Sequence, residues 1–534
     1  MRTICGTMLS CLTRKLKSRY KTLIGLITML LITWVTLSSL IMVNQQVVVN
    51  QRSPFGMDDI VQKQIIQQRR RSSKFQLKDE PQRVRLKLNV AEDKNDNTVH
   101  LIFNDDNELA ELSLPKDVIS RMSLNLTLEF SVHHNLPRGI TIDAIVPEFA
   151  VWKMRNNTFC RNKLVAFANE FAFLENVVVD RTRAHGRRGG EELQSVINQP
   201  EKKEYFKFDK GFFRLPCKAD PSYKFANKNH LNQWISVVDG NDDYYNKSKI
   251  AETKKKFTLA ITRYEFANLY HTMTDFYNAF LMIRFFNKKP DDTTILFVDG
   301  HPKGSLDSIW SKLFNEVQRL GHMSNLTKYS ELVWAAQGYN SPMNHHKLKS
   351  IPLVEDFREF FLARHNVTAR IRPLNCSNVQ LLFIWRHDYV AHPRNPSGSV
   401  SRKIKNEQEL VNSITNKYHN IRIKAIQIDK FDMASQLKMV NEADILVGMH
   451  GAGLSHTLFL PKHAGVIEFY PAYWASSNIH FKAMAHWRKL HYERWVNRDR
   501  HNESPNHYTR IPPGVMTSLL QNILNKLKCQ AMFW

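Results

Sequence analysis

The chain has 534 residues, 75 of them lysine or arginine and 50 aspartate or glutamate, which gives a formal net charge of +25. This length is too great for one hydrophobic core, so at least two domains are expected. Such a positive balance is compatible with nucleic-acid binding, but the membrane topology argued next weighs against a nucleic-acid partner and favours smaller anions or anionic glycans.

The N-terminal part predicts a membrane anchor. Residues 1–22 contain several basic residues and no acidic one, and residues 23–43 form an uncharged, mostly apolar run that is long enough to span a bilayer. A cleavable signal peptide would have a shorter apolar core followed by small residues, whereas this run is followed by the polar residues 44–46. Because the basic residues precede the run, we expect a retained signal anchor, a cytoplasmic tail and a lumenal remainder, which is a type II topology.

The segment after the anchor has the features of a secreted chain. Residues 44–93 are rich in Gln and basic residues and poor in aromatic ones, which predicts a flexible stem. Four cysteines follow, Cys160, Cys217, Cys376 and Cys529, and they allow two disulfides in any of three pairings. N-glycosylation sequons occur after the anchor, at Asn125, Asn156, Asn246, Asn325, Asn366, Asn375 and Asn502.

Residues 94–255 show no regular alternation of helices and strands, although Val99–Phe103 and Leu124–Val132 are strand-like. We expect a partly β accessory region there. From residue 256 the alternation is regular, and residues 256–372 are predicted to be a first α/β domain with a parallel sheet. Its expected elements are strand 257–262, helix 268–286, strand 294–298, helix 305–320 and strand 331–335.

The first of these helices carries an unusual polar stripe. Asn268, His271, Asp275 and Asn278 fall on one face of an otherwise apolar segment. A face exposed to solvent normally carries Lys and Glu, so this composition favours a face that lines a cleft, although a solvated stripe is the simpler alternative.

Residues 373–510 predict a second α/β domain. Its expected elements are strand 379–385, a helix from Asn406, strand 421–428, helix 433–442 and a closing β-α-β unit at 443–470. Two α/β blocks in succession suggest two facing Rossmann-like domains. Residues 511–534 contain an amphipathic helix that is expected to pack on one of these domains.

A glycine-rich turn, His450–Gly453 (H-G-A-G), lies between the predicted strand 443–447 and a helical segment expected from Leu454. Gly451 and Gly453 would let backbone N–H groups approach a ligand, and the N-terminus of the following helix would favour an anion, most simply a phosphate. The glycines fit neither the G-x-G-x-x-G nor the P-loop pattern. Alone, the turn is equally compatible with a structural role.

Three side chains near this turn are further candidates. Arg386 follows the end of strand 379–385, where ligands of parallel sheets collect, and Arg402 could reach the same place through the intervening loop. Either one could equally be an ordinary surface arginine. Glu468, near the end of the next strand, could hold ribose hydroxyls.

Several motifs, taken together, resemble glycosyltransferase family 61. They are I-T-R-Y-E-F-A-N-L-Y-H-T-M-T-D (Ile261–Asp275), F-V-D-G-H (Phe297–His301), D-Y-V-A-H-P-R (Asp388–Arg394), S-R-K-I-K-N-E (Ser401–Glu407) and G-M-H-G-A-G-L-S-H (Gly448–His456). The resemblance extends from about Lys256 to Trp495. Within the family, the second and third motifs are most similar to those of the β-1,2-xylosyltransferase of N-glycans. Trp385 departs from the pattern, since relatives often have a second arginine there.

The resemblance implies a GT-B-like fold of two facing Rossmann-like domains, Golgi residence, UDP-xylose as donor, and transfer with inversion to the core mannose of an N-glycan. It also implies little need for a metal, and the sequence agrees because it contains no D-x-D triplet. In this interpretation Arg386, Arg402, His450, Gly451, Gly453, Glu468 and Asn268 bind substrate, and no cofactor is required.

Inversion in one displacement needs a base that takes the proton of the acceptor hydroxyl. Asp275 and His271, one helical turn apart, are the candidates, and the sequence favours Asp275 because an imidazole beside a diphosphate tends to be protonated. His271 as the base, with Asp275 fixing its tautomer, is the alternative. Three other functions stay open: a family 61 protein O-linked N-acetylglucosaminyltransferase that uses UDP-GlcNAc, an inactive membrane-anchored glycan-binding homologue, and a polyanion-binding surface protein.

Overall fold

The computed structural model describes residues 156–167, 170–217, 236–241, 249–370 and 373–529, residues 149, 152, 153 and 245, and short strands between Arg85 and Leu128. The expected tail at 1–22, the anchor at 23–43 and most of the stem at 44–93 lie outside the described residues. Among those that are described, no helix is long and apolar enough to cross a membrane.

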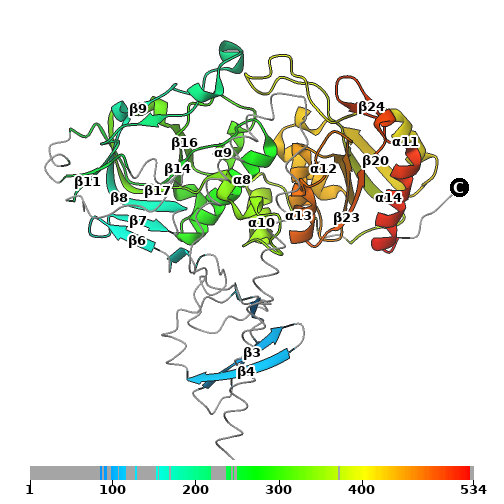
Figure 1. The fold of residues 1–534 in the computed structure, drawn as a ribbon, viewed down its shortest axis with the longest axis horizontal. Coiled ribbons are helices and arrows are strands. Elements are labelled where there is room, and N and C mark those ends of the chain that lie inside the picture. Colours follow the sequence, from blue (N-terminus) through cyan, green and yellow to red (C-terminus); the bar gives the residue numbers. More distant parts are fainter. Residues whose placement is uncertain are drawn as a thin grey trace, which may run out of the picture. The chain divides into compact units, whose positions relative to one another are not determined.

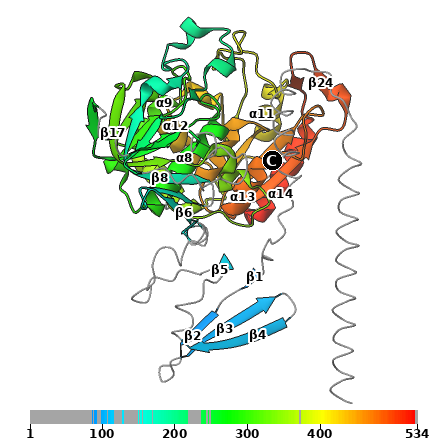
Figure 2. The ribbon, with the colours of Figure 1, turned by 60° about the vertical axis from the view of Figure 1, so that its left-hand side comes forward.

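The most N-terminal strands form two small sheets. One is antiparallel, and Figure 2 shows its three strands β2 (Asn89–Glu92), β3 (Thr98–Asp105) and β4 (Glu108–Pro115). The other pairs β1 (Arg85–Leu86) with β5 (Thr127–Leu128). The strand expected at Val99–Phe103 is therefore confirmed, whereas only two residues of Leu124–Val132 are described as a strand.

The first lobe, which we define as the described residues 156–370, is built on a ten-stranded sheet in which β17, β14, β15 and β16 are parallel neighbours. The ten strands are β6 (Asn156–Phe159), β7 (Leu164–Phe167), β8 (Phe171–Asp180), β11 (Phe213–Leu215), β12 (Val238–Gly240), β13 (Glu252–Lys254), β14 (Phe257–Ile261), β15 (Thr293–Phe297), β16 (Glu316–Arg319) and β17 (Leu326–Trp334). A separate two-stranded antiparallel sheet pairs β9 (Ala184–His185) with β10 (Lys207–Phe208).

The sheet corrects the boundary expected at residue 256. β8 pairs antiparallel with β17 from Leu326↔Asp180 to Trp334↔Ala172, so the supposed accessory strands extend the same sheet. They share its apolar core, in which Val177, Val179 and Leu332 are buried together. Strands β6, β7 and β8 follow one another as an antiparallel series, so they do not show the alternation of strand and helix that marks a parallel sheet.

The helices of the first lobe are α8 (Leu269–Phe285), α9 (Asp307–Leu313) and α10 (Val354–Arg364). The prediction for α8 was within one residue at each end. The helix expected at 305–320 is wrong in its second half, because the chain becomes extended at Phe314 and β16 begins at Glu316. The apolar spacing in this segment satisfied a helical period, and pairing with β15 decided the outcome.

The second lobe, residues 373–529, has a five-stranded parallel sheet in the order β20-β18-β21-β22-β23. The strands are β18 (Val379–Ile384), β20 (Ile421–Ile426), β21 (Ile445–Met449), β22 (Gly465–Tyr470) and β23 (His491–Val496). The helices are α11 (Glu407–Thr415), α12 (Met433–Glu442), α13 (His480–Trp487) and α14 (Pro513–Lys526), and a small sheet joins β19 (Lys403–Ile404), β25 (Tyr508–Thr509) and β24 (Glu503–Ser504). The strand order reverses between β18 and β21, and ligands of open parallel sheets bind outside the carboxyl ends at such a point.

Two disulfides settle the pairing that the sequence left open. Cys160 is bonded to Cys217 within the first lobe, and Cys376 is bonded to Cys529 in the second. The second bond links the segment just before β18 to the end of α14, which packs on the second sheet through Leu520, Ile523 and Leu524. The C-terminal helix therefore belongs to the second lobe, as expected for a helix with one apolar face.

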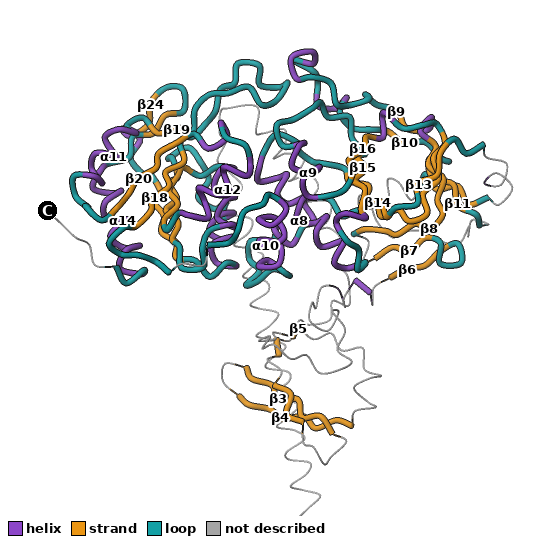
Figure 3. The backbone as a smooth tube through the Cα atoms, turned by 180° about the vertical axis from the view of Figure 1, so that it is seen from behind, coloured by secondary structure: helices purple, strands orange, loops and turns teal. Residues whose placement is uncertain are grey.

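The two lobes meet through helices. In Figures 1 and 3, α8, α10 and α12 lie between the two sheets. Phe361 of α10 stacks on Phe459 of the second lobe with ring centroids 4.7 Å apart. Arg358 of the same helix donates to the carbonyl oxygen of Phe459 and to Oδ1 of Asn441. The interface between the two lobes is thus packed and partly hydrogen-bonded.

Candidate active site

The glycine-rich turn follows β21 at the carboxyl edge of the second sheet, next to the reversal in strand order. It leads into a 3₁₀ helix, η9 (Ala452–Phe459), where a helical segment was expected from Leu454. Gly451 has an extended backbone, with φ of 171°, so its conformation alone does not require glycine. A Cβ at Gly451 would lie 2.0 Å from Nη1 of Arg386, so a larger residue here would displace that guanidinium.

Two arginines lie beside this turn, as the sequence predicted. Nε of Arg386 donates to the carbonyl oxygen of Ser401 at 3.1 Å, and among the described residues no carboxylate pairs with its guanidinium. Burial lowers the pKa of Arg386. The guanidinium of Arg402 lies 3.8 Å from the ring centroid of Trp474. Two cations next to a glycine turn, one of them without a carboxylate, form a site that suits an anionic ligand.

His450 and Glu468 form a buried pair behind the turn. Nδ1 of His450 lies 2.6 Å from Oε1 of Glu468, and the hydroxyl of Tyr492 donates to Oε2 at 2.6 Å. Burial raises the pKa of Glu468 to about 8, and burial together with Arg402 and Arg386 lowers the pKa of His450 to about 3. At neutral pH the proton therefore lies on the carboxyl group. Both oxygens of Glu468 are occupied within the protein and the residue is fully buried, so it does not present a carboxylate for ribose hydroxyls as expected.

The polar stripe of α8 is used mainly inside the protein. Oδ1 of Asn268 accepts a hydrogen bond from the backbone of Tyr270, so Asn268 caps the helix. Nδ2 of Asn278 donates to the carbonyl oxygens of Ala336 and Gln337. Asn278 thus satisfies backbone carbonyl groups of a neighbouring loop. The C-terminal half of the polar stripe does not line a cleft.

The two candidate bases have different surroundings. Asp275 is 1% exposed, and both carboxyl oxygens are buried without a hydrogen-bond partner among the described residues. Burial raises the pKa of Asp275 well above its usual value. His271, one turn earlier, is half-buried between the rings of Tyr264 and Tyr270, and burial lowers its pKa to about 4. Asp275 therefore does not orient His271 by a hydrogen bond, and the neutral imidazole is the more accessible group.

Comparison with known proteins places these features in a family. Residues 269–467 match the family model described as glycosyltransferase 61. This chain carries a glycosyltransferase 61 domain. The resemblance inferred from the motifs is thereby confirmed, and the matched residues include α8, both arginines and the glycine-rich turn.

Named relatives of this glycosyltransferase are transferases as well. It is 26% identical over 379 residues to β-1,2-xylosyltransferase RCN11 of Oryza sativa subsp. japonica, a match that covers 64% of this chain and 69% of the relative. It is 24% identical over 382 residues to the β-1,2-xylosyltransferase of Arabidopsis thaliana, covering 57% and 69%. It is also 27% identical over 241 residues to the EGF domain-specific O-linked N-acetylglucosamine transferase of Mus musculus, covering 43% and 42%. These relatives imply a nucleotide-sugar donor and a glycan acceptor.

Sequence reasoning missed the role of two motifs that it used only for the resemblance. Asp299 of F-V-D-G-H binds the fully buried Arg263 through two hydrogen bonds, Nη2 to Oδ1 at 2.7 Å and Nε to Oδ2 at 3.1 Å. His301 of the same motif contacts Glu204 through Nδ1 at 2.7 Å and the carbonyl oxygen of Arg263 through Nε2 at 3.1 Å. This network supports the segment that leads from β14 into α8.

The other motif, D-Y-V-A-H-P-R, crosses between the lobes. Arg394 forms ion pairs with Glu201 and Glu265 of the first lobe, and the backbone N–H of Asn198 donates to the carbonyl oxygen of Pro393 at 2.9 Å. The loop that begins at Arg386 is therefore fastened to both lobes. The only sequence signal for this contact was the charge of Arg394 within the motif. Its partners, Glu201 and Glu265, lie too far away in the sequence to be predicted.

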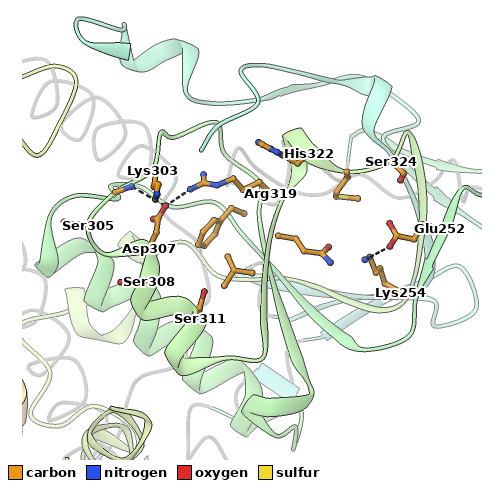
Figure 4. Close-up of a pocket in the computed structure, with 15 residues that line it drawn as sticks. Glu252, Lys254, Lys303, Ser305, Asp307, Ser308, Ser311, Arg319, His322 and Ser324 are labelled. Carbon is orange, nitrogen blue, oxygen red and sulfur yellow. Dashed lines mark hydrogen bonds and ion pairs between the residues drawn. The ribbon is translucent and has the colours of Figure 1, made fainter. Parts of the chain in front are cut away.

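A groove of about 790 Å³ lies elsewhere on the first lobe, and no predicted site residue lines it (Figure 4). Ser305, Ser308 and Ser311 line one side. Its charged residues pair with one another, as in Arg319 with Asp307 and Lys254 with Glu252. The groove therefore offers hydroxyl groups but no uncompensated charge, unlike the arginine site of the second lobe.

The buried pair of this glycosyltransferase predicts a particular pH dependence of stability. The folded chain holds the Glu468 proton up to about pH 8, whereas the unfolded chain loses it near pH 4.5. His450 titrates near pH 3 when folded and near pH 6.5 when unfolded. Between pH 4.5 and 6.5 the two differences cancel. Above pH 6.5 the unfolded chain binds fewer protons, so the free energy of unfolding falls up to about pH 8.

Glu468→Gln should remove that decline, because the amide does not titrate. We expect the melting temperature of this variant to change less between pH 6.5 and 8 than that of the parent chain, as measured by calorimetry. Glu442→Gln, at an exposed position of α12, is the control and should follow the parent. Equal pH slopes for Glu468→Gln and the parent would contradict the proton assignment.

Proposed function

We propose that this glycosyltransferase transfers xylose from UDP-xylose, in β-1,2 linkage and with inversion, to the core mannose of N-glycans. The observation that carries a nucleotide-sugar donor is the arginine-lined glycine turn at the reversal in strand order of the second sheet. The choice of xylose rests on the similarity to two β-1,2-xylosyltransferases over 69% of each relative. In this proposal the two lobes form a GT-B-like pair, with donor and acceptor in the cleft between them.

The diphosphate of the donor would bind against Gly451 and Gly453, between the guanidinium groups of Arg386 and Arg402. Those two charges neutralise the negative charge that develops on the leaving UDP as the bond to the sugar breaks. A divalent cation is then not required, and chelation by EDTA should leave transfer intact.

A donor screen tests the function. Purified protein is offered UDP-xylose, UDP-N-acetylglucosamine and UDP-glucose with an N-glycan acceptor, and pentose transfer from UDP-xylose is expected. Gly451→Val should abolish transfer and UDP binding, because its side chain would displace Arg386. Gly514→Val is the matched control, since a Cβ at Gly514 meets nothing within 4 Å. Transfer from UDP-N-acetylglucosamine alone would favour the O-linked alternative supported by the mouse relative, and binding without turnover would favour an inactive homologue.

The accessible base in the cleft is His271, and the burial of Asp275 moves our assignment from the carboxylate to the imidazole. The acceptor hydroxyl gives its proton to His271 as its oxygen bonds to the anomeric carbon and the bond to the diphosphate breaks. The neutral form that burial favours is the form able to accept a proton.

Paired variants separate the two candidates. His271→Gln should lower kcat by about two to four orders of magnitude while UDP affinity stays within a factor of about two. Asp275→Asn, which retains size, should keep kcat within about tenfold of the parent. Steady-state kinetics and calorimetry measure both quantities. A strong loss of kcat in Asp275→Asn beside a near-normal His271→Gln would restore the carboxylate as the base.

The localisation belongs to the same proposal. Residues 23–43 and their basic N-terminal flank predict a single-pass type II protein of the Golgi membrane with a lumenal catalytic part. In sealed microsomes the C-terminal part should resist protease until detergent is added. Digestion without detergent would place it on the cytoplasmic side and contradict this topology.

A further inference from the structure

A chain of hydrogen bonds joins the two lobes beside the glycine turn. Nδ2 of Asn344 donates to the carbonyl oxygen of Gly338 at 2.6 Å, which leaves its Oδ1 to accept from the hydroxyl of Tyr270 at 2.7 Å. Nε2 of His346 lies 2.7 Å from that hydroxyl and 2.9 Å from Nδ1 of His480. Tyr270, Asn344 and His346 belong to the first lobe, and His480 is the first residue of α13 in the second lobe.

The order of donors and acceptors fixes the tautomers. Tyr270 uses its hydrogen toward Asn344, so its oxygen can only accept from His346. Nε2 of His346 must then carry a hydrogen, and the nearby Nδ1 of His480 must be a bare acceptor. In the neutral ring of His480 the hydrogen is consequently on Nε2.

His480 contacts both the first lobe and the glycine turn. Its ring centroid is 4.4 Å from that of Tyr270 and 5.6 Å from that of His450, with an interplanar angle of 28° to the latter. Nδ1 of His450 is engaged by Glu468 at 2.6 Å. Among the described residues, Nε2 of His480 has no hydrogen-bond partner. His480 therefore presents one N–H donor beside the glycine turn.

The charges around these rings favour neutral donors. Burial, followed by His346, His450, His271 and Arg402, lowers the pKa of His480 to about 2. Arg402 also lowers the pKa of His450, which shows that one guanidinium acts on both rings. Two arginines together with the neutral N–H donor of His480 match the several oxygens of a diphosphate better than the arginines alone.

We propose that His480 binds the diphosphate of the nucleotide-sugar donor through Nε2–H, and that Tyr270 and His346 of the first lobe fix the tautomer that makes this contact possible. This inference rests on the proposed function, because it needs a diphosphate at the glycine turn. His480 is then a ligand of the donor, and His346 is a positioning residue that acts through it. Residues of the first lobe, Tyr270 and His346, thus determine which nitrogen of His480 carries the hydrogen that binds the donor in the second lobe.

Calorimetric titration of UDP against four variants tests the proposal. His480→Phe keeps a ring of similar size but has no N–H, and a lost hydrogen bond to a charged group should raise the Kd for UDP about tenfold or more. His480→Gln places an amide N–H near the position of Nε2 and should stay within about threefold of the parent. His346→Phe should raise the Kd about three- to tenfold, and His346→Gln, which keeps a donor, should restore it.

A double variant distinguishes positioning from a general structural role. If His346 acts through His480, the variant His346→Phe/His480→Phe should bind UDP no more weakly than His480→Phe alone. In steady-state assays the KM for the donor should rise in His346→Phe while the KM for the acceptor stays unchanged. Melting temperatures are measured for every variant so that only folded proteins are compared.

The outcomes are separable from those of the proposed function. If the parent binds UDP, Gly451→Val does not, and folded His480→Phe binds as tightly as the parent, this inference is overturned while the proposed function stands. Additive effects of His346→Phe and His480→Phe would overturn the positioning role of His346. A parent chain that does not bind UDP would overturn both.

Discussion

The geometry of the cleft depends on one packed apolar layer that both lobes share. Phe276 of α8, Phe357 and Phe361 of α10, and Leu458 and Phe459 of η9 are buried in a single cluster. Since protein interiors are close-packed, neither sheet can shift by much without opening cavities in this layer. The glycine turn and α8 are therefore held at a fixed separation. The contacts of His346 with Tyr270, at 2.7 Å, and with His480, at 2.9 Å, depend on the distance between the lobes that this apolar layer sets.

Ion pairs of Arg263 and Arg394 also hold segments of the two lobes in place. Arg263 is fully buried, and its charge is tolerable because Asp299 and Asp307 meet it directly. The segment that it anchors leads into the N-terminus of α8, where Asn268 caps the helix and His271 follows one turn later. Arg394 fastens the loop after β18 to Glu201 and Glu265. His271 and Arg386, the base and the phosphate-binding arginine of the proposed function, thus lie next to segments that ion pairs hold in place.

Local sequence signals found the elements that have a strong period, and they failed where pairing between distant residues decides. The bounds of α8, α12 and β18 followed from apolar spacing and capping, and the glycine turn was located by its two glycines. The burial of Asp275 could not be predicted, because it depends on Gly338, which follows β17 and is distant in the sequence. Gly338 packs closely on Asp275, since a Cβ at Gly338 would lie 2.8 Å from Oδ1 of Asp275. The contact between His346 and His480 joins residues 134 positions apart, so no motif could announce it. Sequence therefore located the glycine turn, and it did not reveal contacts between distant residues.

The neutral state of His450 and His480 follows from their burial and from the arginines beside them. Arg386 is half-buried and has no carboxylate partner among the described residues, and this costs stability. Burial, followed by repulsion from Arg402 and Arg386, lowers the pKa of His450 to about 3. Burial, followed by repulsion from the neighbouring histidines and Arg402, lowers the pKa of His480 to about 2. A bound diphosphate reverses that balance, since its negative charge stabilises the arginines and strengthens every N–H donor around it. In the proposed function, the same arginines that cost stability thus supply the attraction for the donor.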